Sequence, residues 1–148
     1  MAVLRTVNDL KNVLKQPGTL SRVLKPEEFA TEEAIADVLA SEFKTSLKPT
    51  QTRRIFHTIK QIENQTRRMT DDARLKEEDR LRLTLLVPEL AYAAGRDLIP
   101  KEFYEILKLA LAQDKLQTVG DLRRLVQFLT AIVAYQKFHS KFDSGKGH

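Results

Sequence analysis

The stretch TVGDLRRLVQFLTAIVAYQKFH, residues 118–139, contains the richest apolar segment of the chain. Thr118 is followed three residues later by Asp121, a spacing that resembles the capping box at the start of a helix. From there apolar residues fall on most sides of the helix: Leu122, Leu125, Val126, Phe128, Leu129, Ile132, Val133 and Tyr135. A helix that is apolar nearly all round is buried by its neighbours. We therefore expect residues 118–139 to form the central helix of the core.

The composition favours long helices over many short strands. The chain has 148 residues, of which 42% are hydrophobic, and only five are Gly and five Pro. A chain of this length fits one domain, and few turn-forming residues mean few connections. The sequence predicts an all-α fold, a compact bundle of about five to six helices. We divide the chain into a variable N-terminal extension with one acidic helix (1–48), a helical bundle core (49–142) and a flexible tail (143–148).

Local sequence signals place the helices on either side of residue 50. Residues 1–25 have a weak apolar pattern, which the turn-forming pair Pro17-Gly18 interrupts. Pro26, followed by two acids, opens a helix whose loose apolar spacing continues to about residue 48.

Similar signals mark the helices of the second half. A helix is expected to end near residue 95, with Pro88 predicting a break or kink inside it and Gly95 its C-terminal cap. Pro100 starts the next helix, which we expect to reach about Lys115. These helices precede the central one.

The chain contains no Cys, which excludes a disulfide framework, a thiolate nucleophile and a Cys-based zinc site. This composition suits a reducing compartment, and we expect a cytoplasmic protein. Met1–Leu10 lacks the apolar run of a signal peptide, and no stretch approaches the ~20 apolar residues of a membrane span. We therefore expect a soluble protein with no membrane partner.

The charges are segregated along the chain. Residues 26–45 carry six acidic side chains and one basic, whereas residues 46–70 carry six basic and one acidic. Residues 1–25 and 117–148 are also positively charged, and the net charge is +5. Basic blocks of this kind favour a polyanionic partner.

The helix expected over residues 50–69 has the cleanest amphipathic pattern in the chain. One face carries Ile55, Ile59 and Ile62, with Phe56 at their flank. The basic residues that gather on and beside the opposite face form what we call the cationic stripe: Arg53, Arg54, His57, Lys60, Arg67 and Arg68. Only Glu63 opposes their charge, and like charges repel at helical spacing.

Two interpretations of the cationic stripe are open from the pattern alone. It can be the solvated outer face of an amphipathic helix, or it can bind an anion that offsets the repulsion. From Arg53 to Arg67 it spans about 21 Å, enough to follow several phosphates. Arg96 also has two interpretations, bonding to helix-end carbonyls or to a phosphate. Lys137, near the end of the last helix, is expected to point outward.

No recognisable catalytic motif occurs in the sequence. The histidines are His57, His139 and His148, none near a Ser or Asp in a nucleophile motif, and there is no Gly-rich phosphate loop. The acids of residues 71–79 lie in a charged stretch, whereas catalytic carboxylates need burial that separates their pKa values. His139 and Asp143 could share a helix face, but two ligands near a helix end make a poor metal site. We expect no enzymatic activity, cofactor or metal; a hydrolase that uses residues 71–79 is an alternative.

Four sequence strings, in this order and spacing, indicate a family: TQTRRIF (50–56), LLVPELAYAAGR (85–96), FY (103–104) and FLTAIVAYQKF (128–138). Together they resemble the small subunit of the type III-A CRISPR effector, the Csm complex. The second and fourth strings carry most of the specificity. The resemblance covers about residues 50–140, and residues 1–48 lie outside it.

The resemblance implies an all-helical, non-catalytic subunit of an antiviral ribonucleoprotein, present in several copies. It implies contact with the guide RNA and the target RNA, largely through phosphates and without sequence readout. Its other implied partners are further subunits of the complex and copies of itself. Arg53, Arg54, Arg96 and Lys137 lie inside the matched strings, whereas the other basic residues of the stripe depend on the helical pattern. A helical protein–protein adaptor with charged docking faces is the alternative function.

Overall fold

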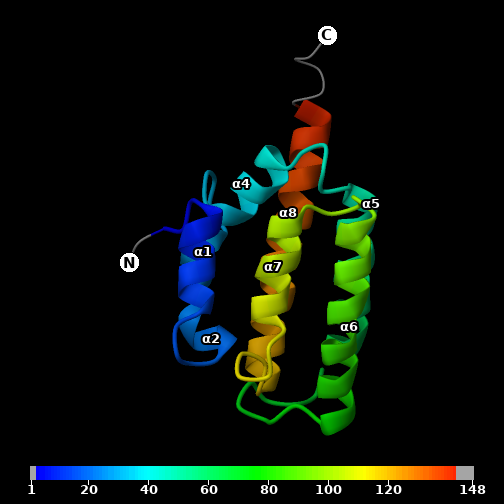
Figure 1. Ribbon diagram of the computed structural model, residues 1–148. Helices are drawn as coiled ribbons and strands as arrows, with labels where there is room; N and C mark the ends of the chain where they lie inside the picture. The colour runs from blue at the N-terminus through cyan, green and yellow to red at the C-terminus, as the bar shows by residue number, and fades with distance from the viewer. Residues whose placement is uncertain (1–2, 143–148) are drawn as a thin grey trace.

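The computed structural model describes residues 3–142, which form eight α-helices and no strand. The helices are α1 (Val7–Leu14), α2 (Leu20–Val23), α3 (Pro26–Phe29), α4 (Ile35–Glu42), α5 (Pro49–Asn64), α6 (Glu77–Gly95), α7 (Lys101–Ala110) and α8 (Val119–Phe142). Figure 1 shows the long helices α5 to α8 running along a common direction. The predicted all-α fold is confirmed. The helix count exceeds the predicted five to six because four short helices precede residue 43.

Helix α8 is the central helix of the bundle, as its apolar sequence predicted. The Thr118 hydroxyl accepts from the Asp121 N–H (3.3 Å), and the Asp121 carboxylate accepts from the Thr118 N–H (2.9 Å), so the predicted capping box is present. Helices α4 and α5 pack along α8, and α2 and α3 also contact it. Inner side chains such as Phe128 have almost no exposed surface. The helix continues to Phe142, slightly beyond its expected end.

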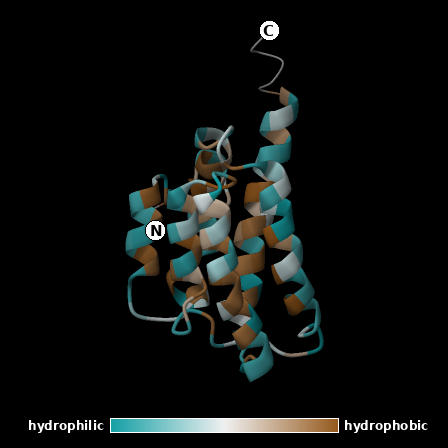
Figure 2. Cartoon of the chain, turned by 45° about the vertical axis from the view of Figure 1, so that its right-hand side comes forward, coloured by the Kyte–Doolittle hydropathy of each residue, from teal (hydrophilic) through white to brown (hydrophobic). Residues whose placement is uncertain are grey.

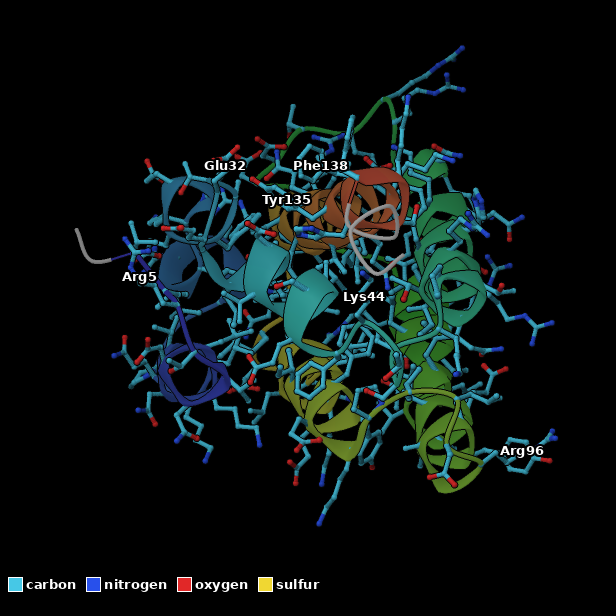
Figure 3. The ribbon with its side chains drawn as sticks, turned by 90° about the horizontal axis from the view of Figure 1, so that it is seen from above. Arg5, Glu32, Lys44, Arg96, Tyr135 and Phe138 are labelled. Carbon is cyan, nitrogen blue, oxygen red and sulfur yellow. The ribbon has the colours of Figure 1, made fainter. Side chains whose placement is uncertain are left out.

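Helices α6 and α7 complete the other side of the bundle, and α1 packs on α7. Figure 3, seen from above, places α6 at an outer corner, with α5 on one side and α7 on the other. Figure 2 shows hydrophobic and hydrophilic residues alternating along the helices, as amphipathic helices around one core require. The core extends from Leu4 to Ile132, so the first four helices contribute to it.

Residues 26–48 do not form the single helix that the sequence predicted. They form α3 and α4, and the chain turns between them at Glu33, whose φ of 68° lies in the left-handed region. The Glu33 N–H then donates to the Asp37 carboxylate (2.8 Å) in the first turn of α4. Because the apolar spacing is loose here, the turn still allows Phe29 and Ile35 to be buried.

Helix α6 runs through Pro88 without the break that the sequence predicted. A proline inside a helix removes one N–H, which here would have bonded the Thr84 carbonyl. Both residues are exposed, so that carbonyl lies on the side of the helix open to water. The local cost is thereby reduced, and packing of the opposite face maintains the helix.

The C-terminal end of α6 differs from the predicted cap at Gly95. Gly95 is the last helical residue, and Asp97 adopts the left-handed conformation with a φ of 60°. The Leu98 N–H donates to the Ala93 carbonyl and the Asp97 N–H to the Ala94 carbonyl, both at 3.0 Å. This is a Schellman motif, with Asp97 in the position that glycine often takes.

Helix α7 ends at Ala110, five residues before the predicted end at Lys115. Lys115 is buried in the following loop, where its ammonium group donates to the Gln16 carbonyl (2.8 Å). Its own carbonyl accepts from the Leu20 N–H (2.9 Å). These bonds fix the loop against the turn at Pro17-Gly18, where the sequence correctly placed a turn and Gly18 has a φ of 116°.

Candidate nucleic-acid interface

Helix α5 carries the first part of the cationic stripe. Pro49 is its first residue, where the missing N–H costs nothing. The buried face carries the three isoleucines that the spacing predicted: Ile55, Ile59 and Ile62. Three basic residues are exposed on the outer side: Arg53, Arg54 and His57. Within residues 3–142, none of these three forms an ion pair.

Arg67 and Arg68 lie beyond the helix rather than on it. Helix α5 ends at Asn64, five residues before the predicted end, and the buried Thr66 hydroxyl donates to the Glu63 carbonyl (2.6 Å) in the following turn. Both arginines are exposed at this end of α5. They therefore do not continue the helical face that carries Arg53 and His57.

Lys60 differs from the other basic residues of α5 because it has an internal partner. Its ammonium nitrogen lies 2.8 Å from a carboxylate oxygen of Glu63, one turn along the helix. The Lys60 side chain is 41% exposed and the Glu63 side chain 16%. Such a pair contributes little to stability, but the carboxylate offsets the charge that Lys60 can present to an anion.

Grooves on both sides of α5 bring basic residues of other helices beside it. The groove between α5 and α8, of about 210 Å³, is lined by Arg53 and Lys137. A groove of about 400 Å³ between α5 and α6 is lined by Arg54 and Arg96. A further groove of about 700 Å³ between the same helices is lined by Arg82. Arg96 projects outward at the corner of the bundle in Figure 3. Lys137 and Arg96 thus extend the basic surface of α5 on opposite sides.

Arg96 does not bond the helix-end carbonyls, which was one of its two interpretations. Backbone N–H groups of the Schellman motif occupy the carbonyls of Ala93 and Ala94. The Arg96 guanidinium instead lies over the ring of Tyr92, 5.7 Å from its centroid, a cation–π geometry. An arginine stacked in this way keeps its N–H edge available to a phosphate.

Two other arginines that contribute to the positive charge of residues 117–148 hold the fold together. Arg123 pairs with Asp71 and donates to the Met69 carbonyl (2.8 Å), which fixes the turn after α5. Arg124 donates to the Ser21 carbonyl (3.1 Å). Residues 117–148 therefore present fewer free cations at the surface than their net charge suggests. The partners are distant in the sequence, so local sequence does not reveal them.

A profile of the family described as Csm2 Type III-A matches residues 27–141. The chain belongs to this family. It is a small subunit of the type III-A CRISPR effector, the Csm complex. The match includes α4 and so begins earlier than the strings near residue 50 that carry the resemblance. No curated protein and no solved structure matches the chain.

Two acids of residues 71–79 and one histidine of this Csm2-family subunit have partners or burial within the fold. Asp71 pairs with Arg123, and Asp79 is buried on the inner side of α6. His139 bonds to Asp37 on α4. In the part of the chain that the structure describes, no three His, Asp or Glu side chains are grouped to hold a metal ion. Asp143, His148 and the predicted flexible tail lie outside the described residues.

The titratable groups with shifted pKa values lie away from the cationic stripe. Burial would raise the pKa of Asp121, but hydrogen bonds from Ser21, Thr118 and Thr19 hold it below its usual value. Burial raises the pKa of the Tyr135 hydroxyl, which donates to the Ala30 carbonyl (2.6 Å). No described helix is long and apolar enough to cross a membrane.

Proposed function

We propose that this Csm2-family subunit binds the backbone of the guide–target RNA duplex without reading its sequence and without catalysing a reaction. The observation that supports this most is the exposed group Arg53, Arg54 and His57. Among residues 3–142 this group forms no ion pair, and it lies between Lys137 and Arg96. Arginine and lysine at such positions bind phosphates and release counterions. Since base pairing supplies the specificity of a guided complex, the protein needs to recognise only backbone and shape.

The remaining roles belong to the same proposal. In the assembled cytoplasmic complex, several copies lie beside the subunits that hold the guide RNA, and target cleavage belongs to those neighbours. The subunit contacts other subunits and further copies of itself. Its part in antiviral defence is to stabilise the paired RNA. Arg67, Arg68 and Lys60 contribute less than Arg53 and Arg54, because two lie off the helical face and one is paired.

The test is a double replacement, Arg53→Ala with Arg54→Ala, in the full chain. We expect affinity for a 20-base-pair RNA duplex to fall about tenfold or more at 50 mM salt. The slope of log affinity against log salt should decrease by about 2, one for each lost phosphate contact. Fluorescence anisotropy measures both quantities, and circular dichroism verifies the fold.

The matched control removes two exposed lysines of α7, Lys101→Ala with Lys108→Ala, which lie outside the grooves beside α5. It lowers the net charge by the same amount. Equal affinities of the Arg53/Arg54 variant and the unaltered chain at low salt would refute the proposal. Equal losses in both double variants would show a general charge effect instead of a site.

A further inference from the structure

The outward side of α6 carries an unusual line of large apolar side chains. Leu81, Leu85 and Tyr92 are 58%, 57% and 67% exposed, and the exposed Pro88 lies between them. We call these four residues the apolar seam. Outward positions of a helix in a soluble protein are normally polar, and contiguous exposed apolar residues mark an interaction surface.

The spacing of the apolar seam is that of a two-helix contact. Its residues are separated by four, three and four positions, the a and d spacing of a coiled coil. They extend over about 16 Å of helix at 1.5 Å per residue. A partner that matches this seam is therefore a second helix with similar spacing.

We propose that the apolar seam binds α6 of a second copy of this chain, in antiparallel orientation. This concerns pairs of the free chain, because a twofold contact closes at two copies. Pro88 and Tyr92 of the seam adjoin the groove of Arg54 and Arg96, so the dimer borders the proposed RNA contact. In the antiparallel register, Leu81 faces Tyr92 of the second copy and Leu85 faces Pro88 of the second copy. The twofold symmetry repeats both contacts, giving four apolar layers.

Charge complementarity supports this partner. Arg82 and Glu89 follow Leu81 and Pro88 and lie on the same edge of the apolar seam. In the antiparallel register, Arg82 faces Glu89 of the second copy, and Glu89 faces Arg82 of the second copy. In the part of the chain that the structure describes, neither residue has an ion-pair partner of its own. On the other edge, Thr84 and Ala91 are small and uncharged.

The ends of the seam favour antiparallel over parallel pairing. Glu78 continues the seam at its N-terminal end, and a parallel pair would place it against Glu78 of the second copy. The antiparallel pair places it against Gly95 of the second copy, where even an added Cβ would meet nothing within 4 Å. The acidic first turn of α6 then approaches Arg96 of the second copy, and the helix dipoles also oppose each other favourably.

Charge reversal tests the register in the full chain without RNA. Arg82→Glu alone sets two acids against each other in the pair, and Glu89→Arg alone sets two arginines against each other. Each variant should self-associate about tenfold or more weakly than the unaltered chain. An equimolar mixture of the two variants should recover dimers, because both cross-pairs become complementary. Sedimentation velocity measures the dimer fraction against concentration.

A control variant separates loss of the α6 contact from a general effect of net charge. Lys108→Glu on α7 changes the charge equally and should leave the dimer unaffected. Monomers of the unaltered chain up to millimolar concentration, or single variants that dimerise like it, would overturn the proposal. Failure of the mixture to recover dimers would overturn the antiparallel register. Leu81→Ala changes no charge and should weaken the dimer while leaving RNA affinity unchanged, which separates this result from the RNA-binding proposal.

An engineered disulfide provides a second measurement, since the chain has no cysteine of its own. Leu81→Cys with Tyr92→Cys should give covalently linked dimers when oxidised glutathione is added. Within one chain the two positions are too far apart along the helix to bond. Leu81→Cys alone should remain monomeric on a denaturing gel, whereas a parallel pair would link it.

Discussion

Helices α5 and α6 are neighbours, but their outer faces differ in chemical character. Both turn an apolar face toward the core, Ile59 in one and Leu83 in the other, each with almost no exposure. The outer side of α5 is cationic and that of α6 is apolar. Core packing fixes only the inner half of an amphipathic helix, so the outer half is free to carry a function. We infer that α5, together with Arg96 at the end of α6, serves a polyanion and that the apolar seam of α6 serves a protein.

The largest expected effect is on the free energy of unfolding, which should fall much more for a replacement on an inner face than for one on an outer face. Ile59→Ala should lower the free energy of unfolding by about 2–4 kcal/mol, because it leaves a cavity in the core. Leu85→Ala on the outer face of α6 should lower it by less than about 0.5 kcal/mol. Urea denaturation at low micromolar concentration, where self-association contributes little, measures both values. A large loss for Leu85→Ala would show that the apolar seam serves the monomer's own stability.

The next largest effect is a difference in salt dependence between RNA binding and self-association. Contacts of Arg53, Arg54, Arg96 and Lys137 with four phosphates predict a loss of RNA affinity of about 100-fold between 50 and 200 mM salt. Self-association through the apolar seam should weaken much less, because burial of apolar surface is not screened and salt acts only on the exposed Arg82–Glu89 pairs. Anisotropy and sedimentation on the same sample series give the two curves. Equal salt dependence of RNA affinity and self-association would contradict the assignment of different ligands to the two outer faces.

The sequence predicted the features that depend on periodicity. The buried isoleucines of α5, the central place of α8 and the capping box at Thr118 all follow from spacing within one helix. The exposed positions of Arg53, Arg54 and Lys137 follow in the same way. These features were predictable because neighbouring residues alone determine them.

Features set by distant residues could not be predicted locally. The early end of α7 is accompanied by the bond from Lys115 to Gln16, and the turn after α5 is fixed by Arg123. The break predicted at Pro88 is absent, because tertiary packing maintains α6 through this residue. The apolar seam was missed because leucines in a helix suggest core until burial is known.

A medium effect tests how Asp121 caps α8 and joins it to α2. Asp121→Asn weakens the cap of α8 and the bond to the Ser21 N–H (2.9 Å), and should lower the free energy of unfolding by about 1–2 kcal/mol at pH 7. Because the folded pKa of Asp121 is lowered, its contribution is present above the ordinary value of 3.8 and is lost as pH falls through the folded pKa. The difference between the variant and the unaltered chain should therefore narrow below about pH 4. Chemical denaturation at several pH values measures it, and a constant difference would contradict the assignment.

The smallest effect concerns the one acid that opposes the cationic face of α5. Glu63→Gln removes the partner of Lys60 and should tighten RNA binding about twofold, because one more cation becomes available to phosphate. Lys60→Ala should then cost more affinity in the Glu63→Gln background than in the unaltered chain. Glu102→Gln on α7 is the control for the change in net charge. Anisotropy on the four members of this double-mutant cycle gives the coupling. Its absence would mean that the ion pair with Glu63 does not limit what Lys60 contributes to RNA binding.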